Sequence, residues 1–280
     1  MPISQAEKGE RFRALHARPG AFVIPNPWDA GTARILTQLG FEALTTTSAG
    51  LAFSLGKRDG TGAVTRAETL ANAKAIVDAT DLPVAADLEN GFGDAPEDAA
   101  ETIRLAGGVG LVGGSIEDSS RDPAHPIYDF QHAVERVAAA AEAARSHRFP
   151  FVLVARAENL LHGRPDLDDT IRRLQAFEKA GADALFAPGL SRREDIAAVC
   201  AAVTRPVNVV VGLGTKLQIS VDELAALGVK RISIGGSLSR AALGAFARAA
   251  REIREHGTFA YSIDAMPSSE ANGYMRGPAA

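Results

Sequence analysis

The sequence predicts an α/β fold, a (β/α)8 barrel of the TIM type, from three observations. Short apolar runs alternate with longer amphipathic segments eight times along the 280 residues. The runs lack an exposed polar face, which is typical of parallel strands covered by helices. No linker or low-complexity segment divides the chain, so we expect residues 1–280 to form one domain. Eight such units suit closure into a barrel, and a doubly wound open sheet is the alternative.

Each expected strand is a short apolar run, and several of the runs end on polar residues or glycine. They cover residues 21–26, 43–48, 83–89, 110–118, 151–158, 184–188, 206–211 and 231–236. The segments between them have the spacing of helices that pack one face on a sheet. We expect these helices at residues 30–40, 66–80, 95–106, 129–147, 168–180, 191–202, 220–227 and 237–256. A glycine-rich loop follows the second strand, and the tail from about residue 258 is expected to be irregular.

Composition argues against several classes of protein. The formal net charge is -4, and no run of Lys or Arg indicates a nucleic acid or a membrane surface as partner. The single cysteine, Cys200, lies in an expected outer helix and fits packing in a reducing cytoplasm, where we expect the protein to act. The polar N-terminus does not resemble a secretory signal, and no run approaches the ~18 apolar residues of a membrane span.

Polar side chains gather at the carboxyl ends of four neighbouring strands. Alternate side chains share one face of a strand. In these four strands, the side chains of one face are small or apolar at the start of the strand and polar at its carboxyl end. In a barrel of this type, chemistry takes place where the strands end. The residues predicted to share this mouth are Ser48, Asp87, Glu89, Glu117, Arg156 and Glu158.

Three carboxylates of this set, Asp87, Glu89 and Glu117, indicate a metal site. Carboxylates that converge in a partly dry site repel one another, so either their pKa values rise or a cation compensates them. Oxygen ligands without a nearby His or Cys favour Mg²⁺ or Mn²⁺ over zinc. The alternative for each carboxylate alone is a helix cap or a pair with a lysine on the rim.

Other residues at this mouth indicate a small anionic substrate. The planar guanidinium of Arg156 suits a substrate carboxylate, and its alternative role is a counter-ion to Glu117 or Glu158. The turn Ser48-Ala49-Gly50 can present backbone N–H groups to an anion. Asn208 and Glu158 are further candidates for contact with the substrate.

With these motifs in place, the chain resembles the isocitrate lyase/phosphoenolpyruvate mutase superfamily. The matching segments run in order as PNPWDAGTARILTQLGFEALTTTSAG, SLGKRDG, LPVAADLENGFGD, GGSIED, FVLVARAENLL and AGADALFAPG. ADLENGFGD followed by IED is the strongest single signal. The resemblance implies a (β/α)8 barrel whose last helix swaps between the subunits of a homodimer or homotetramer.

The resemblance also implies a set of metal-binding residues. Mg²⁺ would be held mainly at Asp87, with Glu89 and Glu117 nearby, partly through water. Asp59, in SLGKRDG, matches an aspartate that faces the same metal region.

Substrate contacts follow from the same resemblance. Ser48 and the backbone of Ala49 and Gly50 match the segment that holds the substrate carboxylate and oxo group. Arg156 matches an arginine that contacts the same small acid.

One segment departs from the superfamily pattern. The lyase branches carry a Lys-Lys-Cys-Gly-His loop after the fourth strand, and its cysteine is the general acid. Here the corresponding loop is DSSRDPAHPIYDF, residues 118–130, without cysteine. His125 is the group in this loop that titrates near neutral pH, which makes it a candidate acid. Tyr128 and metal-bound water are the alternative acids, His125 has the alternative role of an exposed loop residue, and His162 is a candidate for the rim.

We therefore expect a Mg²⁺- or Mn²⁺-dependent lyase acting on a small 2-oxo or 2-hydroxy (di)carboxylate. An enolate intermediate would form by C–C cleavage or decarboxylation of an oxaloacetate- or methylisocitrate-like substrate, with the metal stabilising its charge. One alternative is a phosphonopyruvate-type P–C mutase or hydrolase. The other is a 2-oxo acid binding protein that retained the metal site and lost the acid.

Overall fold

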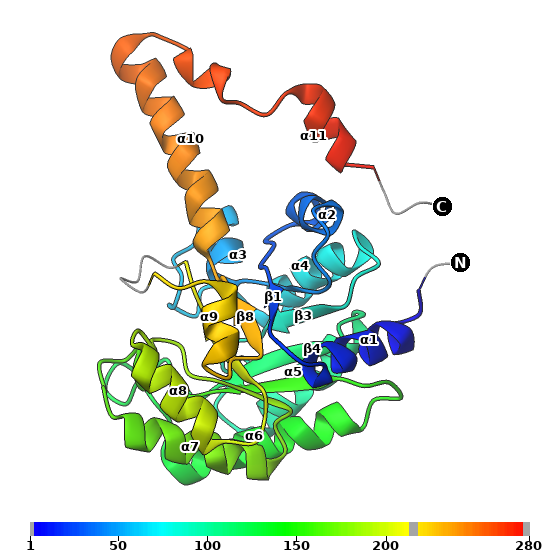
Figure 1. Cartoon of the computed structure of the whole chain (residues 1–280), viewed down its shortest axis with the longest axis vertical. Coiled ribbons are helices and arrows are strands. Elements are labelled where there is room, and N and C mark those ends of the chain that lie inside the picture. The colour runs from blue at the N-terminus through cyan, green and yellow to red at the C-terminus, as the bar shows by residue number, and fades with distance from the viewer. Residues whose placement is uncertain (1–2, 213–217, 277–280) are drawn as a thin grey trace.

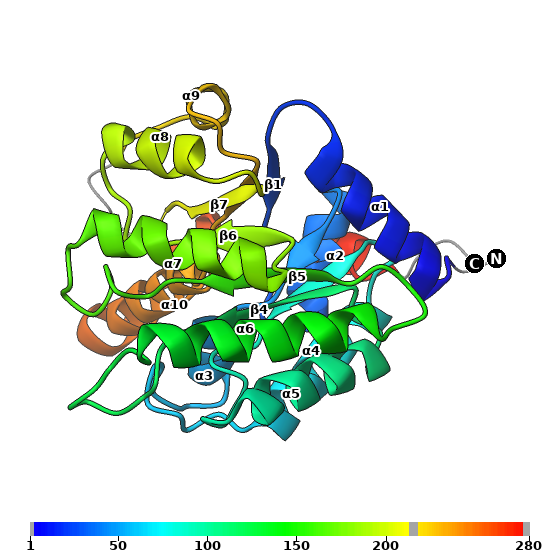
Figure 2. The same ribbon diagram turned by 90° about the horizontal axis from the view of Figure 1, so that it is seen from below.

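The computed structural model describes residues 3–212 and 218–276 and confirms the (β/α)8 barrel. All strand pairs are parallel, and the strand order is β1-β8-β7-β6-β5-β4-β3-β2 (Figures 1 and 2). The strands are β1 (Phe22–Ile24), β2 (Leu44–Thr45), β3 (Val84–Asp87), β4 (Gly113–Glu117), β5 (Val152–Arg156), β6 (Ala184–Phe186), β7 (Val207–Val210) and β8 (Arg231–Ser233). The backbone N–H of Thr45 donates to the carbonyl of Pro25 at 3.0 Å and joins β2 to the end of β1.

Eight of the helices correspond to the expected ones, with small shifts of their ends. They are α2 (Ala30–Gln38), α4 (Arg66–Asp78), α5 (Pro96–Gly108), α6 (Phe130–Arg145), α7 (Leu167–Ala180), α8 (Arg193–Ala202), α9 (Val221–Ala226) and α10 (Ser237–His256). Four further elements were not expected: α1 (Gln5–Ala17), α3 (Ser48–Ser54), the 3-10 helix η1 (Ala260–Ile263) and α11 (Ser268–Tyr274). Two expectations are therefore corrected. The helix α3 occupies part of the expected loop after the second strand, and η1 and α11 lie in the tail that was expected to be irregular.

Local capping explains two of the missed helices. The Ser4 side chain accepts from the N–H of Glu7, and the Glu7 carboxylate accepts from the N–H of Ser4, so α1 starts with a capping box although its sequence is mostly polar. The Thr47 hydroxyl accepts from the N–H of Gly50 at 3.2 Å and starts α3 inside a stretch that looks like a glycine turn.

The N-terminal helix α1 closes the amino-terminal end of the barrel. Phe12 is fully buried against a small cluster that includes Phe22 and Ala85. A Cβ added to Gly113 would lie 2.7 Å from the Phe12 ring, so glycine is required there for this close approach. His16 packs edge-on against Phe12 and Phe22, with its Nδ1 donating to the carbonyl of Phe12.

The strand register connects the mouth of the barrel to its amino-terminal end. Arg156 is the last residue of β5, whereas Arg231 is the first residue of β8. The strands of a barrel are tilted against its axis. A row of register partners therefore moves toward the amino-terminal end of the barrel as it passes from β4 through β5, β6, β7 and β8 to β1. The row runs through Glu117, Arg156, Phe186, Asn208, Arg231 and Phe22.

Helix α10 leaves the barrel instead of packing on it (Figure 1). It spans twenty residues, of which Ser239 is buried. After it, the chain returns so that α11 contacts α2, and Gln38 Nε2 donates to the carbonyl of Tyr274 at 2.7 Å. Within residues 3–212 and 218–276, no helix is both long and apolar enough to cross a membrane.

Burial of His16 predicts a specific acid sensitivity. Burial, followed by the nearby charge of Arg231, lowers the pKa of His16 from 6.5 to about 3. In the folded protein His16 therefore stays neutral as the pH falls from 6.5 toward 3, while the unfolded chain takes up a proton. Stability is lost over that window, by about 2 kcal/mol between pH 7 and pH 5 from this residue.

Urea unfolding at the two pH values measures this effect. His16→Phe keeps a ring between Phe12 and Phe22 but cannot titrate, so its stability should fall less on acidification than that of the wild type. Equal pH dependence of the two proteins would contradict the prediction.

Candidate active site

A cavity of about 160 Å³ opens at the carboxyl ends of the strands, at the predicted mouth. Its lining brings together five of the predicted site residues: Ser48, Ala49, Asp87, Arg156 and Asn208. The loop that follows β1 is fixed here by Asn26, whose Oδ1 accepts from the N–H groups of Ile234 and Gly235. The cavity is therefore enclosed by the barrel strands and by the loops that leave them.

Arg156 lies at the centre of a buried set of ion pairs. Its Nη1 contacts Asp87 Oδ1 at 2.8 Å, its Nη2 contacts Glu117 Oε2 at 3.2 Å, and its Nε contacts Glu158 Oε1 at 2.8 Å. Burial alone would lower the pKa of Arg156, but Glu158, Glu117 and Asp87 together hold it well above its ordinary value. The counter-ion role considered for Arg156 is thus present in the structure.

Negative charge exceeds positive charge around this arginine. Burial raises the pKa of Glu117 well above its ordinary value, and repulsion from Glu158, Asp87 and Glu89 adds to burial while Arg156 opposes it. Burial also raises the pKa of Asp59, with repulsion from Asp87 as the second cause. These carboxylates therefore need either protons or a further cation.

Glu89 is partly neutralised by a second arginine. Arg121 Nη2 lies 2.6 Å from Glu89 Oε2. Burial raises the pKa of Glu89 even so, with Asp87 and Asp59 adding to the shift and Arg121 opposing it. The mouth thus has two guanidinium groups, those of Arg156 and Arg121, and five carboxyl groups. The five are Asp59, Asp87, Glu89, Glu117 and Glu158, so negative charge is in excess.

The donor set is compatible with a hard divalent cation. In the described part of the chain, no three His, Cys, Asp or Glu side chains converge as a ready-made cage. Mg²⁺ usually binds through one or two carboxylates and keeps several waters, so it does not need such a cage. The metal-binding roles of Asp87, Glu89, Glu117 and Asp59 stay predictions.

The segment Ser48-Ala49-Gly50 forms the first turn of α3, and its residues face different ways. The N–H of Ser48 points to Asp87 Oδ2 at 3.3 Å, and Ala49 lines the cavity. Gly50 lies behind the cavity: its N–H is bound by Thr47, and an added Cβ would lie 2.9 Å from the Cβ of Trp28. Gly50 therefore serves close packing of α3 in this structure.

The candidate acids from the short loop do not line the cavity. His125 has 84% of its side chain exposed and its Nδ1 lies 3.2 Å from Asp122. The Tyr128 hydroxyl donates to Asp94, and burial, followed by this hydrogen bond, raises the pKa of Tyr128 to about 12. His162 Nε2 lies 3.2 Å from the Ser119 hydroxyl, away from the lining.

Sequence reasoning missed several polar residues in the cavity lining. Thr45 at the end of β2, Ser115 in β4 and Ser233 at the end of β8 line it, as does Arg231 at the start of β8. The only signal in the sequence is an arginine that opens the otherwise apolar strand RISIGG. Asn208 Nδ2 donates to the Ser233 hydroxyl at 3.0 Å, which fixes the amide on this side of the cavity.

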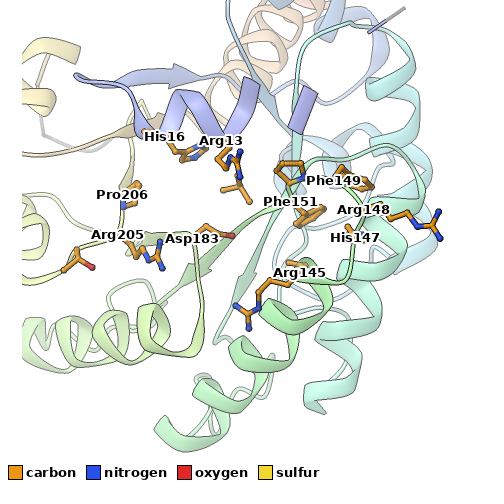
Figure 3. A pocket seen from close by; sticks show the side chains of 15 residues that line it. Arg13, His16, Arg145, His147, Arg148, Phe149, Phe151, Asp183, Arg205 and Pro206 are labelled. Atoms are coloured by element: carbon orange, nitrogen blue, oxygen red, sulfur yellow. The ribbon is translucent and has the colours of Figure 1, made fainter. Parts of the chain in front are cut away.

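A larger cavity, of about 800 Å³, lies at the opposite end of the barrel (Figure 3). It is lined by basic side chains, including Arg13, Arg145, Arg148 and Arg205, and by Asp183 as its carboxylate. Barrel enzymes of this type work at the carboxyl ends of the strands, where the carboxylates gather. The smaller cavity is therefore the candidate active site.

Comparison with known proteins places the chain among lyases and mutases. The sequence model of the phosphoenolpyruvate phosphomutase family matches residues 12–254. An uncharacterized protein of Mycobacterium tuberculosis is 33% identical, covering 87% of this chain and 89% of that protein. An oxaloacetate decarboxylase of Bradyrhizobium diazoefficiens is 32% identical over 71% of this chain and 69% of its own length. A 2-methylisocitrate lyase of Bacillus subtilis is 28% identical over 91% and 84%.

Solved structures agree with this grouping. A Burkholderia cenocepacia J2315 protein with a suggested lyase or mutase activity has 59% identity and a TM-score of 0.94, covering 98% of this chain and 97% of that chain. An oxaloacetate acetylhydrolase in complex with its product oxalate has 27% identity and a TM-score of 0.87, covering 98% and 94%.

The ion pairs of Arg156 generate a stability prediction. Arg156→Met leaves Glu117 and Glu158 buried without their cation, so we expect a loss of about 3 kcal/mol in the free energy of unfolding at pH 7. The loss should shrink as the pH falls and Glu117, whose pKa burial raises, takes up a proton. Chemical denaturation at pH 7 and pH 5 measures both effects, and Arg104→Met, which removes an exposed pair with Glu101, is the control. An unchanged stability at pH 7 would contradict the prediction.

Proposed function

The chain belongs to the phosphoenolpyruvate phosphomutase family, within the isocitrate lyase/phosphoenolpyruvate mutase superfamily, and from this premise we propose a lyase that needs a divalent cation. It would break a C–C bond of a small 2-oxo or 2-hydroxy dicarboxylate and leave an enolate, with oxaloacetate-like decarboxylation as the favoured reaction. The observation that carries this proposal is the buried Arg156 with its three carboxylates at the edge of the cavity.

Arg156 keeps the capacity to bind a substrate carboxylate. A guanidinium group has five N–H donors, of which Nε donates one to Glu158 and Nη1 donates one to Asp87, while Nη2 forms an ion pair with Glu117. At least two donors remain for a ligand in the cavity. The substrate carboxylate would be oriented by these donors and by the nearby start of α3 at Ser48 and Ala49.

The excess of carboxylates supports a divalent cation as cofactor. Asp87, Glu89, Glu117 and Asp59 are the residues that would hold Mg²⁺ or Mn²⁺. Such an ion, when bound, stabilises negative charge on the oxygen of an enolate. The oxygen donors and their mutual repulsion fit this ion better than zinc.

The cavity lining favours decarboxylation over cleavage of a hydroxy acid. Among its described residues there is no histidine, cysteine or tyrosine, and Asp87 is the one carboxyl group. Cleavage of a 2-hydroxy acid needs a base for the hydroxyl proton and an acid for the new carbanion. Loss of CO₂ from a 2-oxo dicarboxylate needs neither in the bond-breaking step, and the enolate then takes a proton from water.

A substrate panel tests the proposed function. Oxaloacetate, 2-methylisocitrate and phosphonopyruvate are incubated with the protein and Mg²⁺, and pyruvate, succinate and phosphate are measured. Pyruvate from oxaloacetate is the expected result. Phosphate from phosphonopyruvate would indicate the P–C alternative. No turnover in the panel, together with binding of oxalate measured separately by calorimetry, would indicate a binding protein.

We infer that the chain forms a homo-oligomer through α10. Leu243, Phe246 and Ile253 project from this helix with large apolar side chains exposed, and Phe246 is 73% exposed. A hollow of about 200 Å³ at the base of the helix, lined by Trp28 and Phe53 among others, adds apolar surface. An exposed apolar face of this kind is typical of a subunit interface. A swapped helix, as the superfamily resemblance implies, would cover it.

The first prediction from the proposed function concerns Asp87. Asp87→Asn should lower Mg²⁺-dependent turnover by at least about 100-fold, because this carboxylate links Arg156, the N–H of Ser48 and the expected metal. Steady-state assays over a Mg²⁺ titration measure the effect. Asp78→Asn, in an exposed pair with Lys74, should behave as the wild type. Full activity of Asp87→Asn would count against the assignment.

The second prediction concerns α10. Phe246→Glu combined with Leu243→Glu should convert the protein to smaller species, because two charges would be buried in the interface. Size-exclusion chromatography with light scattering gives the mass of each protein. Glu255→Gln, an exposed change at the end of the same helix, is the control. A monomeric wild type would rule out the proposed interface.

A further inference from the structure

Arg231 is a buried cation for which the described residues supply no ion pair and no acceptor at two of its three guanidinium nitrogens. It is 4% exposed, and its Nε and Nη1 atoms are neither exposed nor hydrogen-bonded to any described residue. The ring of Phe12 lies 5.8 Å from its guanidinium carbon, and its charge acts on His16. Burial lowers the pKa of Arg231 to about 10, which still leaves it charged at pH 7.

The other buried arginines of the described chain are all provided with acceptors. Arg156 has its three carboxylates, and Arg173 contacts Asp118 at 3.0 Å and Asp169 at 2.9 Å. Arg136 donates to the carbonyls of the segment 90–95. Buried charges in proteins are normally paired in this way, because an unpaired one costs free energy. Arg231 therefore calls for a partner that the described part of the chain does not supply.

The position of Arg231 shows where such a partner would lie. Arg231 lines the lower part of the candidate active site, and its register partner on β7 is Asn208. The Oδ1 atom of Asn208 is also buried without a hydrogen bond. The same cavity is lined by Arg156, at the carboxyl end of β5. One cavity of about 160 Å³ thus has a cation at its mouth and another in its lower part.

We propose that Arg231 recognises a second anionic group of the substrate, so that the enzyme selects dicarboxylates over monocarboxylates of the same length. This inference rests on the proposed function, because it takes the cavity to be the substrate site. Arg156 would hold the carboxylate next to the reacting carbon, and Arg231 the distal carboxylate. Nη2, which is not among the enclosed nitrogens of Arg231, is the atom that would donate to that carboxylate in a charge-assisted hydrogen bond.

Hydroxyl groups in the lining of the same cavity are consistent with this assignment. Thr45, Ser115 and Ser233 offer hydroxyl groups that can complete the hydrogen bonds of a carboxylate. Asp183 lies in the larger cavity beyond the amino-terminal end of the barrel (Figure 3). It accepts from the N–H of Leu153, and the charges that act on it are those of Arg205 and Arg145.

Calorimetry with matched ligand pairs tests the proposal. Malate is compared with 2-hydroxybutanoate, and 2-oxoglutarate with 2-oxopentanoate, each with Mg²⁺; the members of a pair differ in the distal carboxylate. The wild type should prefer the dicarboxylate at least about 10-fold in one pair. In Arg231→Met and in Arg231→Gln this preference should fall to about twofold or less, while affinity for oxalate, which lacks a distal group, changes by less than about threefold.

Two controls separate the possible causes. Arg148→Met removes an exposed cation at the opposite end of the barrel and should keep the preference (Figure 3). Thermal melting checks folding, and Arg231→Met should melt at the same temperature as the wild type or higher, because an unpaired buried charge is removed. A preference that survives in the folded Arg231 variants, or that the wild type lacks, overturns the proposal. Failure of oxalate to bind the wild type would instead overturn the proposed function itself.

Discussion

The pairing of one buried arginine with three carboxylates is the interaction on which the site depends. β3, β4 and β5 are neighbours in register, so Asp87 lies beside Ser115 and Glu117 beside Arg156. This arrangement buries charged groups in the barrel, where they lose the stabilisation that water gives them. Arg156 makes their burial tolerable, yet it cannot neutralise all of them. The remaining negative charge is what makes a divalent cation a reasonable cofactor at this mouth.

Barrel geometry then determines what the rest of the cavity can recognise. The register row that begins at Glu117 descends through Phe186 and Asn208 to Arg231, so residues far apart in sequence share one interior. Below that level, α1 closes the barrel with Phe12, and the close approach to Gly113 leaves no room for a side chain. The cavity is therefore open at the carboxyl end and closed beneath Arg231, which suits a short substrate with a charge at each end.

Much of the barrel and of its candidate site was predictable from the sequence, because side chains alternate regularly along a strand and the order of strands in a barrel is regular. Asp87, Ser48 and Arg156 follow from the polar ends of apolar strands, and the structure brings them together. α1 and α3 were missed because capping at Ser4 and Thr47 starts them without a clear apolar period. Arg231 was missed because its lack of a partner is visible only once its neighbours are known. His125 looked suitable by residue type, but loop residues have no fixed parity, and its position could not be derived.

Two electrostatic features of the barrel interior are unfavourable for the same reason. The carboxylates around Arg156 repel one another, and Nε and Nη1 of Arg231 are buried without an acceptor among the described residues. Neither feature helps the barrel to fold, so a role in stability does not explain them. Both are relieved by ligands of opposite charge, a cation at the mouth and an anion below it. Ligands that bind only the folded protein stabilise it, so these charges would couple the stability of the barrel to metal and substrate together.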